Sequence, residues 1–171
     1  MTNPDEIIIR GKPPVEPPQG QTWRAMMDVA MRQGFEARSN DEVPIGAALF
    51  SADGELLGTG SNSPVNDQDP TAHAEIKCLR SACKNLDNYR LPHGTILAVT
   101  LEPCIMCLGA IIHARVAGIV FGAADTKAGA VVSNLEGTEL PFVNHKFWAL
   151  GGVRADECRT MLQSFFMQRR K

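Results

Sequence analysis

Apolar residues recur at helical spacing near both ends of the chain, with short continuous apolar runs between them. The first helical pattern begins near Thr22, and the last spans about residues 155–168. Each pattern predicts a helix with one buried face. The residues on these two faces are Trp23, Met26, Met27, Ala30, Met31 and Phe35, and Cys158, Met161, Leu162, Phe165 and Phe166.

The short apolar runs predict buried strands at residues 45–50, 55–60, 95–100 and 118–121, with a further strand near 148–153. Asp53-Gly54 indicates a tight turn between the first two strands. Two more helices are expected. One covers about residues 72–86, and the other runs from Pro103 to about residue 114, since a proline at a first helical position loses no needed N–H. This order predicts an α/β fold, a three-layer α/β/α sandwich around a mixed five-stranded sheet.

The proline distribution divides the chain into an arm and a domain. Residues 1–20 contain five of the eleven prolines. Such a composition is typical of an extended, flexible arm with few backbone donors. Residues 21–171 are long enough to bury a substantial core and are interpreted as one domain.

Composition restricts the possible partners and the compartment. The chain is 44% hydrophobic and 21% charged, with a formal net charge of −2, so nucleic-acid binding requires a local basic patch. The last 18 residues, 154–171, provide one, with five Lys or Arg against two acids. No apolar run is long enough for a membrane span and no signal peptide is recognisable, so a cytoplasmic location is expected. Five cysteines, an odd number, indicate reduced thiols or metal thiolates.

The stretch LEPCIMC, residues 101–107, carries the first candidate chemistry. Cys104 and Cys107 lie three residues apart at the predicted start of a helix. This spacing places both sulfurs on one face, and the helix N-terminus favours thiolates. Two thiolates form half of a tetrahedral zinc site, although a redox pair or half of a structural zinc site has the same pattern. Cys78 and Cys83 lie five residues apart in a predicted helix and are interpreted as packing residues.

DPTAHAEIKC, residues 69–78, supplies a third ligand of the right kind in His73. One His and two Cys leave one position of a tetrahedral zinc open for water, the pattern of a catalytic site. Glu75 is placed to carry the proton of that water. Residues two apart on a helix point to nearly opposite sides, so both side chains reach one pocket only at the first turn. Pro70 and Thr71 fit such a helix start.

The chain resembles the zinc nucleobase deaminases, whose signature combines H-x-E with P-C-x-x-C, and more narrowly the bacterial deaminases of the tRNA wobble adenosine. The resemblance covers residues 22–170. It rests on the stretches EVPIGA (42–47), DPTAHAEI (69–76), NYRL (88–91), VTLEPCIMCLGAIIHAR (99–115), VFGAADTKAGA (120–130), NH (144–145), and ADEC followed by FF and RR near the end.

The resemblance implies a cytidine deaminase-like fold and one Zn²⁺ per chain on His73, Cys104 and Cys107. It implies that zinc-bound hydroxide attacks C6 of adenine, that Glu75 shuttles protons, and that ammonia leaves to give inosine. A homodimer and a tRNA anticodon stem-loop as substrate are expected for the same reason. The substrate-binding positions that it implies are Asn62, Val43, Pro44, Asp125 and Asn144. Phe166, Arg169 and Arg170 are also expected to contact the substrate, because an aromatic residue beside basic residues suits stacking on splayed bases and contacts with phosphates.

Two other functions remain open at this point. A free nucleobase or nucleoside deaminase, of guanine or cytosine type, would use the same metal site without a basic C-terminal segment. An RNA-binding protein with structural zinc would need a fourth protein ligand and would not need Glu75. His113, on the helix that follows the cysteines, is interpreted as structural.

Overall fold

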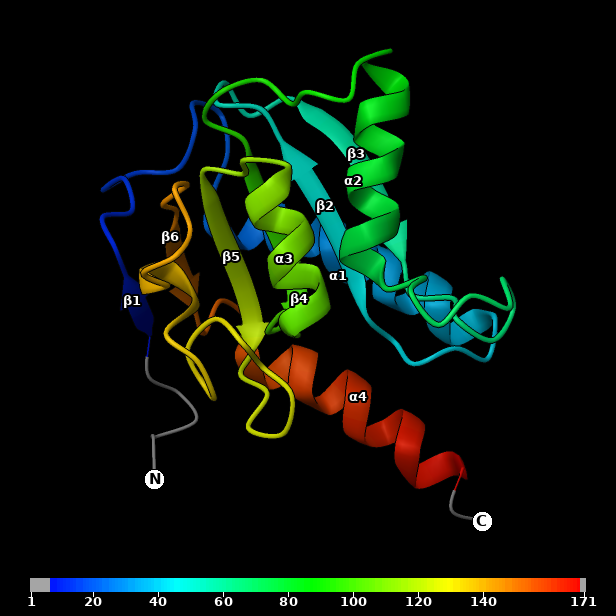
Figure 1. Cartoon of the computed structure of the whole chain (residues 1–171). Helices are drawn as coiled ribbons and strands as arrows, with labels where there is room; N and C mark the ends of the chain where they lie inside the picture. The colour runs from blue at the N-terminus through cyan, green and yellow to red at the C-terminus, as the bar shows by residue number, and fades with distance from the viewer. Residues whose placement is uncertain (1–6, 170–171) are drawn as a thin grey trace.

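The computed structural model describes residues 7–169, which form one mixed sheet with a pair of helices on each face (Figure 1). The helices are α1 (Trp23–Ser39), α2 (Ala74–Asn85), α3 (Ile105–His113) and α4 (Ala155–Arg169), with a short 3-10 helix at Gly137–Glu139. The strands are β1 (Ile8–Arg10), β2 (Gly46–Phe50), β3 (Leu56–Ser61), β4 (Ile96–Leu101), β5 (Gly118–Ala123) and β6 (Trp148–Gly151).

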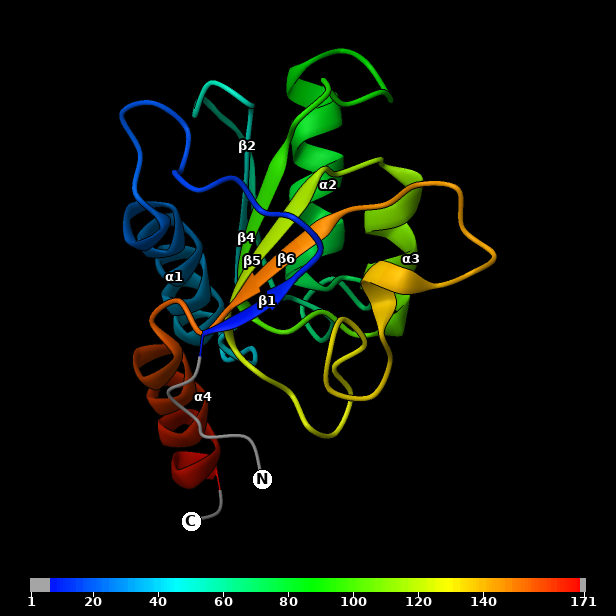
Figure 2. The same cartoon turned by 90° about the vertical axis from the view of Figure 1, so that its left-hand side faces the viewer.

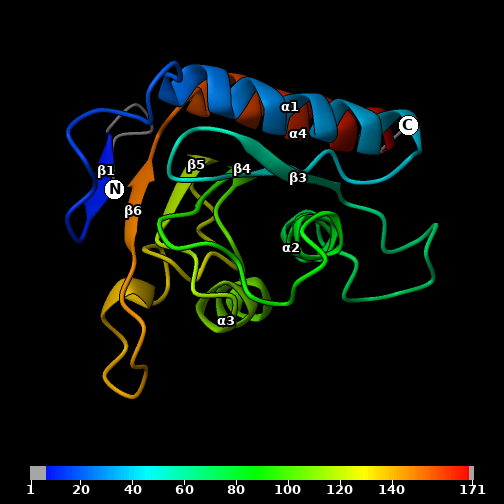
Figure 3. The same cartoon turned by 90° about the horizontal axis from the view of Figure 1, so that it is seen from above.

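The views along the sheet show three layers, with α1 and α4 on one face and α2 and α3 on the other (Figures 2 and 3). The predicted α/β/α sandwich is therefore confirmed. The strand order is β1-β6-β5-β4-β2-β3. Strands β4, β5 and β6 are parallel to one another, while β2 is antiparallel to β4 and to β3.

The sheet has six strands, so the prediction of five is wrong. The additional strand is β1, which pairs antiparallel with β6 through Ile8↔Gly151 and Arg10↔Ala149. It lies inside the proline-rich segment predicted as a flexible arm, and the three residues carry no proline, so each keeps its backbone donor. Residues 8–10 thus belong to the sheet.

Each face of the sheet buries its own core. Strand residues of alternating direction divide between the two, with Leu97 and Val99 facing α2 and α3, and Ile96 and Ala98 facing α1 and α4. Thr22 caps α1, since its hydroxyl accepts the N–H of Ala25 at 2.9 Å. Within residues 7–169, no helix has the length and hydropathy that a membrane crossing requires.

Two predicted core aromatics are instead exposed. Phe35 on α1 is 51% exposed and Phe166 on α4 is 46% exposed. Both follow the apolar spacing of their helix, yet each lies at the margin of the buried stripe. Neighbouring Phe165, in contrast, is 4% exposed.

Glycines let α2 lie directly on β3. A Cβ atom at Gly60 would overlap the backbone of Ala74 and Cys78, and one at Gly58 would overlap that of Ala82. The absence of these side chains fixes the distance between α2 and the sheet. It thereby fixes where the N-terminus of α2 lies.

Candidate active site

Three potential metal ligands meet where α2 and α3 begin. The Nδ1 atom of His73 lies 3.6 Å from the Sγ atom of Cys104 and 3.6 Å from that of Cys107. All the ligand atoms of this group lie within 4.8 Å of one another. One imidazole nitrogen and two sulfurs at these separations fit a zinc ion with a further position open to a small ligand.

The ligands converge because two of them precede their helices. His73 is the N-cap of α2 with extended backbone angles (φ −72°, ψ 152°), and Cys104 is the N-cap of α3 (φ −74°, ψ 173°). Neither side chain forms a capping hydrogen bond within its helix, which leaves it available to a metal. Cys107 lies in the first turn of α3, on the side of Cys104.

The pKa values of the two thiols, Cys104 and Cys107, are shifted in opposite directions. The hydrogen bond with Cys107, together with the His73 ring, lowers the pKa of Cys104 to about 3. The same hydrogen bond and burial raise the pKa of Cys107. The hydrogen bond to Cys104 raises the pKa of His73, and burial opposes this shift. One thiolate therefore exists at neutral pH even without a metal, and zinc would displace the proton of the second thiol.

Glu75 lies in the first turn of α2 and is 4% exposed. Burial is the main cause that raises its pKa, and the charge of Cys104 acts in the same direction. The charge of His73 and a hydrogen bond with Cys107 lower it. A carboxyl group held beside the ligands with a raised pKa is suited to accept and return a proton.

Three of the residues expected to line the pocket, Asn62, Val43 and Pro44, lie on backbone segments that are hydrogen-bonded to each other. Asn62 is 5% exposed, and its backbone N–H donates to the carbonyl of Ile45 at 3.0 Å, directly after Val43 and Pro44. Ser63 N–H donates to the carbonyl of Ala72 at 3.0 Å. The residues that flank Asn62 and His73 are therefore hydrogen-bonded to each other.

Asp125 and Asn144, two further residues expected to bind the substrate, lie on two different loops. Asp125 follows β5, and its Oδ1 atom accepts the N–H groups of Lys127 at 2.9 Å and Ala128 at 3.2 Å. Asn144 is exposed and lines a groove along α3, beside Ile105 and Phe142. Asn144 thus lies along α3, and the next residue, His145, contacts the carbonyl of Val116 at 2.7 Å, beyond the C-terminal end of that helix.

The end of α4 is tied to the loop that follows α1. Arg169 donates to the backbone carbonyl of Asp41, and its guanidinium lies 4.5 Å from the ring centre of Phe165. Phe166 packs edge-on against Phe165 at 5.5 Å. The hydrogen bond from Arg169 to Asp41 places the end of α4 beside the segment that leads into Val43. Arg170 lies outside the described residues.

Residues outside the predicted set also support the site. Glu42, 2% exposed, accepts the N–H of Asn66 at 2.7 Å and thereby holds the loop between Asn62 and His73. Glu102 is likewise 2% exposed and accepts hydrogen bonds from the loop that contains Asp125. Glu42 lies two residues before Pro44, and Glu102 lies directly before Pro103. Each acid is also next to an apolar strand. An acidic residue beside an apolar strand and a proline is the sequence signal that could have identified Glu42 and Glu102 as supporting residues.

The other polar residues singled out in the sequence lie apart from the ligands. Cys78 is fully buried and donates to the carbonyl of Gly58 at 3.4 Å, and burial raises its pKa. Cys83 is half-buried near the carbonyl of Tyr89. His113 is exposed in the last turn of α3.

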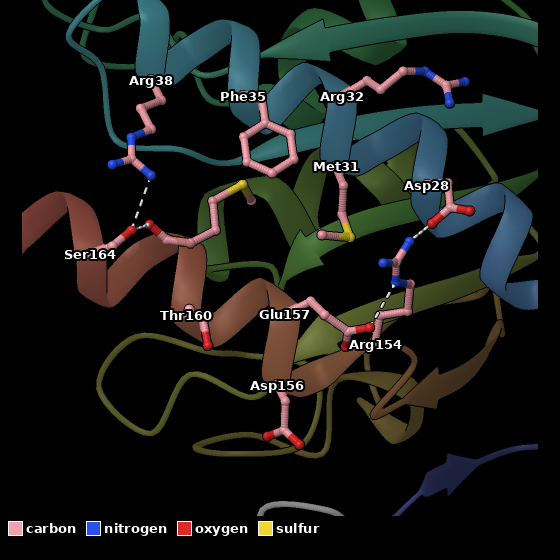
Figure 4. Close-up of a pocket in the computed structure, with 11 residues that line it drawn as sticks. Asp28, Met31, Arg32, Phe35, Arg38, Arg154, Asp156, Glu157, Thr160 and Ser164 are labelled. Atoms are coloured by element: carbon pink, nitrogen blue, oxygen red, sulfur yellow. Dashed lines mark hydrogen bonds and ion pairs between the residues drawn. The ribbon is translucent and has the colours of Figure 1, made fainter.

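A groove of about 650 Å³ lies between α1 and α4, on the opposite face of the sheet from the ligand helices. Its close-up shows Met31 and Phe35 on α1 facing α4, with Arg154 between Asp28 and Glu157 (Figure 4). Arg154 is thus paired with two acids. None of His73, Cys104 and Cys107 lines this groove, which is therefore distinct from the candidate active site.

The fold and this ligand set define a zinc-dependent deaminase of the cytidine deaminase class. Residues 21–123 match the family described as the cytidine and deoxycytidylate deaminase zinc-binding region. This range contains His73, Glu75, Cys104 and Cys107, so the match includes every residue of the proposed metal centre.

Comparison with individual relatives indicates to which family within this class the chain belongs. A tRNA-specific adenosine deaminase of Haemophilus influenzae is 44% identical over 146 residues, which cover 85% of this chain and 84% of that protein. A solved structure from a study of A-to-I editing by tRNA:A34 deaminases has a TM-score of 0.74 at 40% identity, over 80% of this chain and 98% of that chain. A guanine deaminase from Nitrosomonas europaea gives 0.72 at 26% identity, over 91% and 93%. The chain belongs to the family of tRNA-specific adenosine deaminases.

Proposed function

We propose that this protein hydrolyses the wobble adenosine of a tRNA anticodon to inosine, with release of ammonia. The observation that carries the proposal is the convergence of His73, Cys104 and Cys107 beside the buried acid Glu75. The similarity to tRNA-specific adenosine deaminases over 85% of the chain favours adenosine in tRNA as the substrate.

His73, Cys104 and Cys107 would hold the zinc ion. When bound, zinc lowers the pKa of a water molecule so that a hydroxide is available near neutral pH. Glu75 accepts the proton of this water and later delivers a proton to the departing amino group. Because Glu75 is shielded from solvent, its proton is exchanged with the reacting groups rather than with bulk water.

The remaining predicted residues would bind the substrate. The buried Asn62 would hydrogen-bond the base, while Val43 and Pro44 would pack against it. Asp125 and Asn144 would contact the neighbouring nucleotides. Phe166, Arg169 and Arg170 would provide stacking and phosphate contacts for a splayed anticodon loop. The tie between Arg169 and Asp41, two residues before Val43, supports placing the basic end of α4 at this pocket.

We further propose that the protein acts as a homodimer in the cytoplasm, where its tRNA substrate is found. The groove along α3 supports the dimer, because it exposes Phe142 (81%) and Ile105 (60%), the residue that follows the ligand Cys104. Apolar side chains this exposed are typical of a protein interface. A second copy packed there would cover them and border the site.

The decisive experiment incubates zinc-loaded protein with an anticodon stem-loop whose wobble base is adenine. Inosine is detected by nuclease digestion and mass spectrometry. A matched stem-loop with guanine at the wobble position controls for base specificity. If no adenine-containing anticodon stem-loop yields inosine, the proposal is contradicted.

Deamination of a free base is the second candidate function, because the guanine deaminase from Nitrosomonas europaea has nearly the same fold over most of both chains. Free guanine and cytidine are therefore assayed in parallel. Turnover of either one, without turnover of RNA, would favour this candidate. Binding of a small base should also be nearly independent of salt, whereas RNA binding should weaken steeply.

A further inference from the structure

Glu102 is a buried carboxylate between β4 and the metal ligands. It follows Leu101, the last residue of β4, and is separated from Cys104 by Pro103 alone. The residue is 2% exposed. A buried carboxylate is costly unless hydrogen bonds replace its hydration, so its partners indicate what it stabilises.

Five donors from one distant loop meet this carboxylate. Its Oε1 atom accepts three consecutive backbone N–H groups, those of Val131 (3.1 Å), Val132 (2.8 Å) and Ser133 (2.9 Å). Its Oε2 atom accepts the N–H of Asp125 at 3.0 Å and the hydroxyl of Ser133. Successive N–H groups of this kind form an anion-binding nest. Here, the anion is a side chain of the protein itself.

The same loop is also joined to the backbone of the ligand segment. Ala130 N–H donates to the carbonyl of Pro103 at 2.8 Å, and Gly129 forms an isolated bridge with Cys104. A Cβ atom at Gly129 would overlap the Glu102 carboxylate. The loop therefore closes tightly on the segment that presents Cys104.

We propose that Glu102 is a positioning residue that sets Asp125 at a fixed place relative to the metal ligand Cys104. The proposal rests on the proposed function, in which Asp125 contacts the nucleotide next to the reacting base. Because Glu102 holds the backbone of Asp125, the Asp125 carboxylate is already in place before the RNA binds. Such preorganisation lowers the entropic cost of binding.

The test substitutes Glu102→Gln. The amide oxygen can still accept the three N–H groups of residues 131–133. The amide NH₂ then faces the N–H of Asp125, which cannot accept, and the hydroxyl of Ser133, which can turn to accept. The hydrogen bond that is lost is therefore the one with the Asp125 N–H. For the stem-loop substrate, we expect KM to rise about tenfold, because a hydrogen bond to a charged group is lost. We expect kcat and the zinc content to stay near those of the wild type.

Ser133→Ala is the matched control, since it removes a donor to the same oxygen without opposing Asp125 N–H. It should leave KM within about twofold. In an Asp125→Ala background, Glu102→Gln should cause little further rise in KM, because both changes act on one interaction. Independent, multiplicative effects in the double variant would overturn the proposal. A loss of zinc and kcat at unchanged KM would also overturn it.

Hydrogen exchange separates this proposal from the proposed function. In Glu102→Gln, the amide of residue 125 should exchange faster, while the first turns of α2 and α3 keep their protection. If the wild type forms no inosine, the proposed function fails, yet faster exchange at residue 125 still supports the role of Glu102. Unchanged exchange at that amide contradicts it, whatever the activity.

Discussion

Substitution of Gly60 by alanine tests how the sheet places the metal centre. Gly60 lies on β3 beneath α2, and a Cβ atom there would overlap the backbone of Ala74 and Cys78. Neither neighbour can move alone, since both belong to the backbone of α2. The helix as a whole has to shift away from the sheet, and His73 and Glu75 at its N-terminus shift with it.

The size of the effect follows from the overlap. Restoring an ordinary contact distance needs a displacement of α2 by roughly 1 Å. Overpacking of this kind costs about 1–3 kcal/mol, which lowers Tm by roughly 2–12 °C in a domain of this size. A misplacement of about 1 Å at catalytic groups costs on the order of 100-fold in rate. We therefore expect reduced stability together with a large loss of kcat.

Three measurements check this prediction, namely thermal unfolding, zinc content and kcat for the anticodon stem-loop. Gly109→Ala is the control for the effect of the exchange on Tm alone, because a Cβ atom there meets nothing within 4 Å of the same chain. Its kcat is not used as a control, since Gly109 lines the α3 groove proposed as the dimer contact. In the interior of α3, alanine should stabilise the protein by about 0.5–1 kcal/mol. If Gly60→Ala kept the Tm, zinc content and kcat of the wild type, the reasoning on α2 would be refuted.

Three further predictions concern the site. Glu75→Gln keeps the shape of the side chain but not its proton transfer, so kcat should fall by about 10²–10⁴, while mass spectrometry should still find one zinc ion per chain. Cys107→Ser should lose stoichiometric zinc and activity, whereas Cys78→Ser, at a buried cysteine outside the cluster, should keep both. Arg169→Ala should weaken RNA binding and reduce the slope of log Kd against log salt by about one. Arg24→Ala, at the far end of α1, should leave that slope unchanged. Titrations at four salt concentrations distinguish these two outcomes.

The layered fold was predictable because its elements have strong local signals. Buried strands such as β4 are continuous apolar runs, and α1 shows both a capping Thr22 and a regular apolar face. Strand β1 was not predictable from its own residues. It has three residues, two of them partly buried, and it forms because β6 offers a free edge. That edge depends on the order of strands in space, which no local pattern contains.

The metal ligands were predictable for a different reason, since their chemistry restricts both residue type and spacing. The loops that face them obey no such restriction. Glu102 acts on backbone N–H groups about 30 residues away in sequence, and any residue except proline can supply an N–H group. Apart from the hydroxyl of Ser133, the partners of Glu102 therefore have no characteristic side chains. The same holds for Glu42, whose partner is the N–H of Asn66.

The spacing of the metal-centre residues follows from where the two helices begin. Side chains two apart within a helix diverge, yet His73 and Glu75 serve one site because His73 precedes the helix in extended conformation. Cys104 and Cys107 use the same arrangement, with one residue at the cap and one in the first turn. The four positions are thus set by two helix N-termini, and a backbone N–H of α3, that of Cys107, also helps to lower the pKa of Cys104. Any change that extended α2 backwards by one turn would place His73 on the helix and rotate it away from Glu75, even with every ligand retained.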